Sequence, residues 1–305
     1  MQSILTKGPL RVLLLAGSSR RRLHCAGAES KARALMLRMA ARLPPEWEID
    51  VEDLGNVRGG ARIQSCSGCV STSMALCCWP CNCYRPNDRV EPDLLWDRDL
   101  YARLDRADAW AVIGPVHWNA PTSNLKLLFD RLVCMSGGNP RPDLIDGKDP
   151  EKARELERSP LWRELTANHL EGRTAAFFCY GNAGGDELDE TGRPRILRHR
   201  DWLDPRLDRY QDGRDTYAPL VQQCRYSGIE VPDELWRYVE FGRGRNYGED
   251  QVEQLAREPA LSGFDEWTDR FAAVVRAKGK VEPGRYRAFG RVDASARTRN
   301  LEGAS

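Results

Sequence analysis

The sequence predicts an α/β fold in which a doubly wound, parallel, five-stranded sheet carries helices on both faces. Three short, almost wholly apolar runs lie at 11–16, 109–114 and 173–180, and such runs are typical of strands buried on both faces. Stretches with helical periodicity separate these runs, as right-handed crossovers between parallel strands require. We therefore expect ligands to bind beyond the carboxyl ends of the strands.

The first part of the chain predicts a strand, a helix and an edge strand. After the strand at 11–16, the segment 30–43 has its apolar side chains on one helical face and is ended by Pro44. Residues 48–54 alternate apolar and acidic side chains, as an edge strand does. The stretch 55–92 holds six cysteines and little periodicity, which predicts a long functional loop.

The rest of the chain continues the alternation, with one interruption. In order we expect a helix at 95–106, a strand at 109–114, a helix at 121–135, a polar insertion at 136–172, a strand at 173–180, a helix at 217–226, a fifth strand opening at 229–231 and a terminal helix at 263–277. This predicts one domain over residues 1–278. Residues 279–305, rich in Arg and Gly, are expected to form a flexible tail or an oligomer arm.

Composition excludes several classes of partner. With 46 basic and 45 acidic residues the net charge is +1, so nothing points to nucleic acid or to a strongly acidic partner. No apolar run approaches the ~20 residues that a membrane span needs, and the first residues do not read as a signal peptide. We therefore expect a cytoplasmic protein with no membrane partner, whose ten cysteines are metal ligands, redox thiols or buried apolar residues rather than a disulfide framework.

Polar loops follow the buried strands where ligands are expected. Gly17, Ser18, Ser19 and Arg20 lead from the first strand toward a helix, and backbone N–H groups, hydroxyls and a guanidinium together form a phosphate site. The alternative is an ordinary strand-to-helix turn in which Ser30 is the N-cap.

A second loop carries a family resemblance. The sequence GPVHWNAP at 114–121 follows a buried strand and is followed by LKLLFDRL at 125–132. In this order, and with the preceding Gly-Ser-x-Arg loop, these motifs resemble those of the NADPH-dependent FMN reductase family, whose members are flavodoxin-like. The resemblance covers roughly residues 10–185. The segment 20–29 departs from it, because it is longer than the usual phosphate loop.

The resemblance implies an FMN site made by three loops. The FMN phosphate would be held by Gly17, Ser18, Arg20 and Ser30; the ribityl chain and ring would be lined by Pro115, Val116, His117, Trp118 and Asn119; and the other ring edge would be covered by Tyr180, Gly181, Asn182, Gly184 and Gly185. Trp118 is the candidate wall of the flavin, although core packing is an alternative. His117 is a candidate catalytic residue that protonates a substrate. Asp130 is expected to pair with a cation on its own helix.

The implied activity is an NAD(P)H-dependent oxidoreductase. NAD(P)H would be the co-substrate, and electrons would pass through FMN to a small-molecule acceptor or to a metal centre in the cysteine loop. Family members often dimerise, so a homodimer or homotetramer is expected. The competing hypothesis is a metal-binding or thiol redox-sensing protein on a flavodoxin-like scaffold.

The cysteine loop leaves three interpretations open. Cys66 and Cys69 form a C-x-x-C pair, followed by Cys77, Cys78, Cys81 and Cys83, and thiolates this close can hold an iron–sulfur cluster or zinc, or act as redox thiols. The C-x-x-C pair resembles the iron–sulfur flavoprotein branch of the family. That resemblance implies a cluster held by Cys66, Cys69, Cys78 and Cys81, with Cys77 and Cys83 as alternatives. No third cysteine lies at 70–76, where that branch has one.

Overall fold

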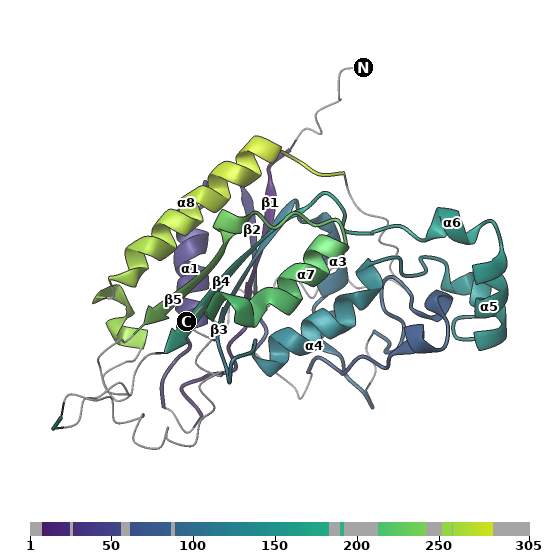
Figure 1. Cartoon of the computed structure of the whole chain (residues 1–305), viewed down its shortest axis with the longest axis horizontal. Helices are drawn as coiled ribbons and strands as arrows, with labels where there is room; N and C mark the ends of the chain where they lie inside the picture. Colours follow the sequence, from purple (N-terminus) through teal and green to yellow (C-terminus); the bar gives the residue numbers. More distant parts are fainter. Residues whose placement is uncertain are drawn as a thin grey trace.

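The computed structural model describes residues 8–24, 27–55, 62–86, 89–182, 190–191, 213–241, 252–257 and 259–282. They form one sheet in the order β2-β1-β3-β4-β5, with each neighbouring pair parallel (Figure 1). The strands are β1 (Arg11–Ala16), β2 (Glu48–Asp53), β3 (Ala109–Pro115), β4 (Thr174–Asn182) and β5 (Trp236–Phe241). The predicted doubly wound, parallel, five-stranded sheet is confirmed.

The strand order reverses at β1. Leu14 of β1 lies opposite Val51 of β2 on one side and Ala111 of β3 on the other. The chain thus moves outward from β1 to β2 and then crosses back to β3. The helical connections diverge at such a reversal, which opens a crevice beyond the carboxyl ends of the two central strands. In this fold the reversal falls between β1 and β3, so the loops that follow these two strands are where a ligand is expected.

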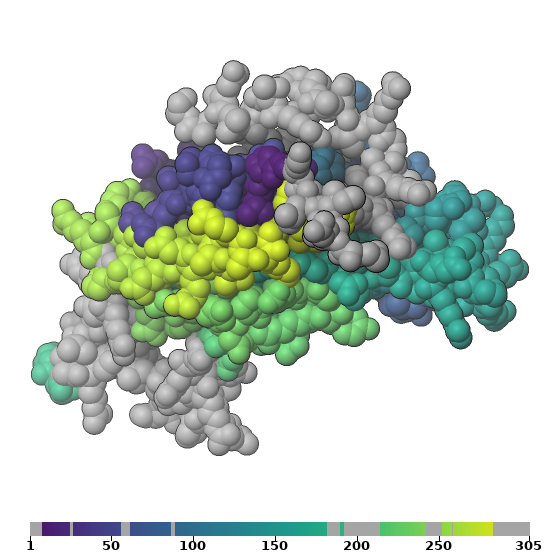
Figure 2. Space-filling model, turned by 90° about the horizontal axis from the view of Figure 1, so that it is seen from above, coloured from purple at the N-terminus to yellow at the C-terminus, as the bar shows by residue number. Residues whose placement is uncertain are grey.

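Helices cover both faces of the sheet. Helices α1 (Lys31–Arg42) and α8 (Ala260–Lys278) share one apolar core with alternate β1 residues such as Leu14, and they lie side by side (Figure 2). Helices α3 (Leu100–Arg106), α4 (Ser123–Arg131) and α7 (Ala218–Tyr226) share the other core with Leu13 and Leu15. The period-two alternation of β1 therefore supplies both layers. No helix in the described part of the chain is long and apolar enough to span a membrane.

Several predicted elements differ at their ends. The single helix expected at 95–106 is two helices, α2 (Leu94–Asp97) and α3, because Asp99 between them has a left-handed φ of 53°. The fifth strand does not open at 229–231. Glu230 makes only one isolated bridge, to Thr174, and β5 begins at Trp236, because Pro232 has no N–H for the ladder.

Short 3-10 turns complete the described chain. They are η1 (Cys69–Ser71), η2 (Met74–Leu76), η3 (Leu132–Met135), η4 (Pro142–Ile145), η7 (Gly213–Tyr217), η8 (Asp233–Leu235) and η9 (Val252–Arg257). The helix expected at 121–135 is therefore α4 followed by η3. The terminal helix begins at Ala260 rather than at residue 263.

The insertion at 136–172 and the cysteine loop build a lobe beside the sheet. It contains α5 (Pro150–Arg158) and α6 (Trp162–Leu165), and its teal residues gather at one end of the molecule (Figure 2). A small separate core joins the two segments, made of Ala75, Cys78, Ile145, Ala153 and Leu156. The sequence analysis predicted an insertion outside the sheet but not this shared core.

The start of the expected tail lies against the sheet. The Val281 N–H donates to Asp108 Oδ1 at 2.9 Å, and Asp108 Oδ2 accepts the N–H of Arg11 at 2.8 Å. Residues 283–305 of the expected tail or oligomer arm lie outside the described residues. The division into a domain over 1–278 and a tail stays a prediction.

Candidate functional site

The loop after β1 is packed closely against its neighbours. The Gly17 N–H donates to Ile113 O at 2.8 Å, and the Arg20 N–H donates to the buried Ser18 Oγ at 3.2 Å. A Cβ on Gly17 would lie 2.3 Å from the Leu125 side chain. Only glycine therefore allows this loop to turn under the start of α4, with the Ser18 hydroxyl and the Arg20 side chain at the carboxyl edge.

Ser30 lies at the start of a helix, as expected both for an N-cap and for a phosphate ligand. It is the N-cap of α1, where its buried Oγ accepts the Arg33 N–H at 3.3 Å. A hydroxyl that accepts one hydrogen bond can still donate its own hydrogen. N-capping and phosphate binding are therefore compatible at Ser30.

The end of β2 neutralises other arginines near this loop. Asp53 accepts Arg33 Nε at 2.8 Å and lies 3.7 Å from the Arg21 guanidinium. Arg21 Nε also donates to Gly55 O at 2.8 Å, and burial lowers the pKa of Arg21. Arg21 and Arg33 therefore both have protein partners at the end of β2.

The loop after β3 is a tight hairpin with an exposed indole at its tip. The His117 N–H donates to Ala120 O at 2.8 Å, and the Ala120 N–H returns to His117 O at 3.2 Å. Trp118 and Asn119 between them have φ of 52° and 56°, as a type I′ turn requires. The Trp118 side chain is 90% exposed, so the core-packing alternative is excluded.

This turn is costly for the residues that occupy it. A left-handed φ at a bulky residue such as Trp118 costs of order 1–3 kcal/mol, and strain of this kind gathers at functional sites. An exposed large aromatic adds the cost of wetted apolar surface. The strained backbone and the exposed indole both destabilise the free protein. Both are explained if the indole contacts a ligand.

Two side chains at the start of α4 join the loops, and the sequence analysis missed both. The buried Thr122 hydroxyl donates to Gly17 O and accepts the Leu125 N–H at 3.5 Å. The Asn124 amide donates to Ser19 Oγ at 2.9 Å and to Leu54 O at 3.1 Å. Both residues could have been identified from the sequence, because they are polar and lie at the N-cap and first turn of a helix that follows a predicted ligand loop.

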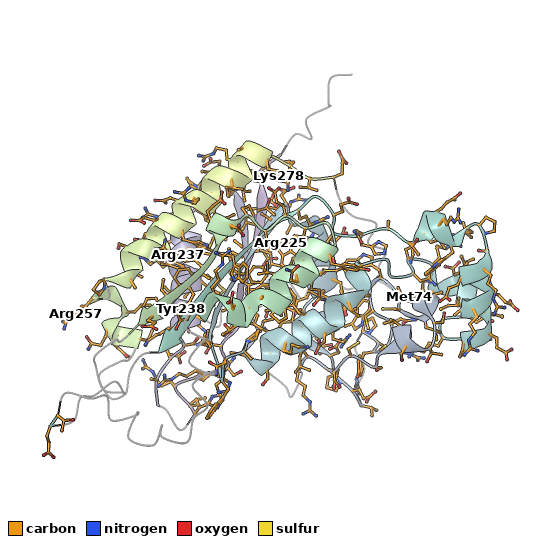
Figure 3. All side chains as sticks on the ribbon, viewed as in Figure 1. Met74, Arg225, Arg237, Tyr238, Arg257 and Lys278 are labelled. Carbon is orange, nitrogen blue, oxygen red and sulfur yellow. The ribbon has the colours of Figure 1, made fainter. Side chains whose placement is uncertain are left out.

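The third predicted segment is mostly strand. β4 continues to Asn182, so Tyr180 and Gly181 are buried strand residues and not a covering loop. Tyr238 on β5 is labelled in Figure 3. A Cβ on Gly181 would lie 2.2 Å from the Tyr238 hydroxyl, a proximity that the sequence did not reveal. Gly184 and Gly185, with the Asn182 side chain, lie outside the described residues.

The hairpin and this strand are also hydrogen-bonded. The Val116 N–H donates to Tyr180 O at 2.8 Å, and the Tyr217 hydroxyl donates to Pro115 O at 3.0 Å. The loop after β3 is thus held at its base while Trp118 remains exposed at its tip. The structure brings together the predicted residues at 17–20, 30 and 115–119 along one sheet edge.

Two charged residues near the end of the motif at 125–132 form ion pairs within the protein. Lys126 pairs with Asp130 one turn later, as expected for Asp130. Arg131 is fully buried and bonds Asp93 through both Nη atoms, at 3.0 and 2.8 Å. Its guanidinium also lies 4.5 Å from the centre of the Tyr84 ring. Arg131 Nη1 also donates to Gln64 O at 3.2 Å, so Arg131 contacts the cysteine loop on both sides of its six cysteines.

The thiols of that loop have different environments. Cys69 Sγ lies 2.9 Å from Cys83 Sγ, and this hydrogen bond lowers the pKa of Cys69. Burial raises the pKa of Cys77 to about 12. Cys78 is buried in the small core of the lobe, where its thiol donates to Leu76 O at 3.6 Å and burial raises its pKa.

The thiols do not fit a metal in this arrangement. Within the described ranges no group of three or more Cys, His, Asp or Glu side chains is placed to hold a metal ion. Two sulfurs bound to one tetrahedral zinc at about 2.3 Å lie about 3.8 Å apart, farther than the 2.9 Å between Cys69 and Cys83. The iron–sulfur cluster implied by the resemblance finds no support here, and the ligand set of Cys66, Cys69, Cys78 and Cys81 stays a prediction.

The chain is similar to known proteins in sequence and in fold. Residues 10–200 match the model of the NADPH-dependent FMN reductase family. Similar solved structures include an NAD(P)H:quinone oxidoreductase from Methanothermobacter marburgensis, at 15% identity over 88% of this chain and 96% of that one, with a TM-score of 0.43. Another is an FMN-dependent NADH-azoreductase from Bacillus anthracis str. Ames Ancestor, at 14% identity over 86% and 99%, with a TM-score of 0.37. No curated protein matches the sequence.

Proposed function

Because the chain belongs to the NADPH-dependent FMN reductase family and is an NAD(P)H-dependent FMN oxidoreductase, we propose that it reduces a small planar organic molecule at the crevice between the β1 and β3 loops. When bound, FMN supplies the hydride and electron transfer, which need no side-chain redox group. The observation that carries the proposal is the exposed, strained Trp118 at the tip of the β3 hairpin, directly beside the strand-order reversal.

The phosphate end of FMN would lie on the β1 loop. Ser18 and Arg20 in the loop after β1 offer a hydroxyl and a guanidinium, and Ser30 offers a second hydroxyl at the N-cap of α1. The positive end of the α1 dipole adds to the attraction for a dianion. Thr122 and Asn124 would act as positioning residues, because they hold this loop to the start of α4.

The ring end of FMN would lie along the β3 hairpin. Pro115, Val116 and Asn119 would line it, with Trp118 as the apolar wall. Buried Tyr180 and Gly181, with Tyr238 beside them, would make a floor that excludes water from below. His117 is exposed at the base of the same turn, where it would give a proton to the reduced acceptor.

Other parts of the proposal concern partners and location. The exposed Trp118 suits a homodimer or homotetramer in which a neighbouring subunit covers the flavin. The nine free cysteines among the described residues suit the reducing cytoplasm. A cysteine-bound metal centre is not included as the acceptor, because the described thiols do not fit one.

Reoxidation by added acceptors tests the proposed function. The FMN-loaded protein is reduced without oxygen by NADH or NADPH and then mixed with a soluble quinone, a nitroaromatic, an azo dye or ferricyanide. We expect at least one organic acceptor to reoxidise the protein faster than it reoxidises free reduced FMN. His117→Gln should slow the quinone, by up to about 10²-fold, and leave ferricyanide unchanged, since that acceptor takes electrons without a proton. Organic acceptors that react no faster than with free FMN would contradict the proposal.

A further inference from the structure

The segment that carries the six clustered cysteines is hydrogen-bonded to the insertion at 136–172. The Trp79 N–H donates to Asn139 O at 2.9 Å, and the Asn139 N–H donates back to Cys77 O at 2.7 Å. Asn139 is fully buried and also donates through Nδ2 to Ala75 O at 3.0 Å. Glu157 of α5 accepts from Ser73 and Ala75. These contacts set where the thiols lie, and none of them involves the residues proposed for FMN.

Two of the thiols are brought together from opposite ends of this segment. Cys69 opens η1 and Cys83 follows 14 positions later, yet their Sγ atoms are 2.9 Å apart. Both residues are half-buried, whereas Cys78 and Cys81 are buried. A disulfide needs the sulfurs at about 2.05 Å, so closing the pair requires movement of under about 1 Å.

Two cationic residues lie close to Cys83 in space or in sequence. The exposed Lys148 donates from its ammonium to Cys83 O at 3.4 Å, and Arg85 is exposed two residues beyond Cys83. A cation this close favours an anionic reactant by lowering the cost of its approach. A small disulfide that carries carboxylates is an anionic reactant of this kind.

We propose that Cys69 and Cys83 form a dithiol–disulfide couple that is oxidised by an anionic low-molecular-weight disulfide. One protein thiol, having lost its proton, attacks a sulfur of the small disulfide, breaks its S–S bond and releases one small thiol. The second protein thiol then attacks the protein sulfur of the mixed disulfide and releases the other small thiol. The protein loses two electrons and two protons, the small disulfide gains both, and one S–S bond replaces another.

The Cys69–Cys83 couple does not depend on the proposed flavin chemistry. It can be tested by cleaving the oxidised protein and asking which fragments remain joined by a disulfide. The purified full-length protein is incubated with oxidised glutathione, its remaining thiols are alkylated, and it is digested with trypsin and cyanogen bromide. Cleavage after Met74, which lies in the lobe (Figure 3), separates Cys66 and Cys69 from Cys77, Cys78, Cys81 and Cys83. We expect the two fragments to remain joined by a reducible link in mass spectra.

Matched variants identify the two sulfurs. Cys69→Ser and Cys83→Ser should each lose the joined fragments, while Cys66→Ser, the neighbouring thiol on the same fragment, should keep them. Circular dichroism on each variant establishes that it folds. A link that survives in Cys69→Ser or Cys83→Ser, or wild-type protein whose Cys69 and Cys83 are both fully alkylated after oxidation, would overturn the proposal. Stoichiometric iron or zinc that is released when Cys69 is replaced would overturn it too.

The preference for an anionic disulfide is tested by comparing the rates of two reagents of opposite charge. Oxidised glutathione, which is anionic, should form the link faster than the cationic disulfide cystamine at low ionic strength, and Lys148→Met should reduce that difference. Equal rates for the two reagents with the wild-type protein would contradict the assignment of an anionic oxidant.

Discussion

The side-chain amide of Asn124 in the first turn of α4 donates to the hydroxyl of Ser19 in the loop after β1, at 2.9 Å. The same amide donates to Leu54 O at 3.1 Å, at the end of β2. One side chain at the start of α4 therefore joins the chain segments that leave β1 and β2. These segments are linked without any ligand present, and such preorganisation lowers the entropy cost of binding between them.

Replacing Asn124 tests whether this link positions the FMN loop. Asn124→Ala removes two hydrogen bonds, each with a net contribution of about 1 kcal/mol, so we expect FMN affinity to fall by up to about 10- to 30-fold. Quenching of flavin fluorescence during titration measures the Kd. Lys126→Ala, an exposed residue on the same helix, is the control and should bind FMN as the wild type does. An unchanged Kd in Asn124→Ala would show that the link does not matter for binding.

Trp118 should matter for the reaction and not for the fold. Because its side chain is 90% exposed, Trp118→Ala should change the free energy of unfolding by less than about 0.5 kcal/mol. Trp118→Gly should raise it slightly, since glycine accepts the left-handed φ of 52° without strain. Both variants should lower kcat/KM for the organic acceptor.

Thermal unfolding and steady-state kinetics on the same samples measure these two effects. Tyr226→Ala, which removes another exposed aromatic at the end of α7, serves as the control and should leave kcat/KM unchanged. Loss of stability in Trp118→Ala without loss of activity would mean that the indole packs against the protein and not against a ligand.

The buried Arg131–Asp93 pair should be the most sensitive point of the lobe. Arg131→Met leaves the Asp93 carboxylate buried without its partner, and breaking such a pair costs about 3–5 kcal/mol. Arg141→Met removes the exposed pair with Asp143 and should cost less than about 1 kcal/mol. Denaturant unfolding measures both. Similar values for the two variants would contradict a structural role for Arg131.

Acid should weaken the contact between α1 and α8. The hydrogen bond from Arg38 holds the pKa of Asp265 below its usual value. A carboxyl whose pKa is depressed on folding stabilises the protein above its unfolded pKa of about 3.9, and this stabilisation is lost as pH falls through the folded value.

We therefore expect the free energy of unfolding to fall below about pH 4, and less steeply in Asp265→Asn than in the wild type. Arg38→Met is the matched variant, because it removes the same ion pair from the other side. Denaturant unfolding between pH 3 and pH 7 measures the slopes. Identical slopes in all three proteins would exclude a contribution from this pair.

The sheet could be predicted from the sequence because its strands are local apolar runs. Leu13 and Leu15 alternate with Val12 and Leu14 toward two cores, and that pattern is legible without any tertiary contact. β5 was missed at its true start because Trp236–Phe241 is only partly buried and follows Pro232, so its pattern lacks a clear apolar run.

The candidate site could be proposed from the sequence where a motif marks it, and could not where distant segments meet. Ser18, Arg20 and the 115–119 loop stand in recognisable motifs, and the structure brings them to one sheet edge. Tyr238 reaches Gly181 only through strand pairing, which a single sequence does not reveal. The insertion at 136–172 was predicted, but its contacts with the cysteine loop were missed for the same reason, since Asn139 bonds to Ala75 across 64 positions of chain.

Binding of FMN to the β1 loop is the central claim, and an equilibrium titration tests it most directly. Wild-type protein freed of flavin is titrated with FMN, and the Ser18→Ala/Arg20→Ala double variant, shown by circular dichroism to be folded, is titrated in parallel. The account predicts saturable quenching at one FMN per chain in the wild type, and affinity reduced by at least about 100-fold in the variant, since two contacts to a charged phosphate are each worth about 1.5–3 kcal/mol. A wild type that binds no FMN, or a double variant that binds it equally well, would contradict the account.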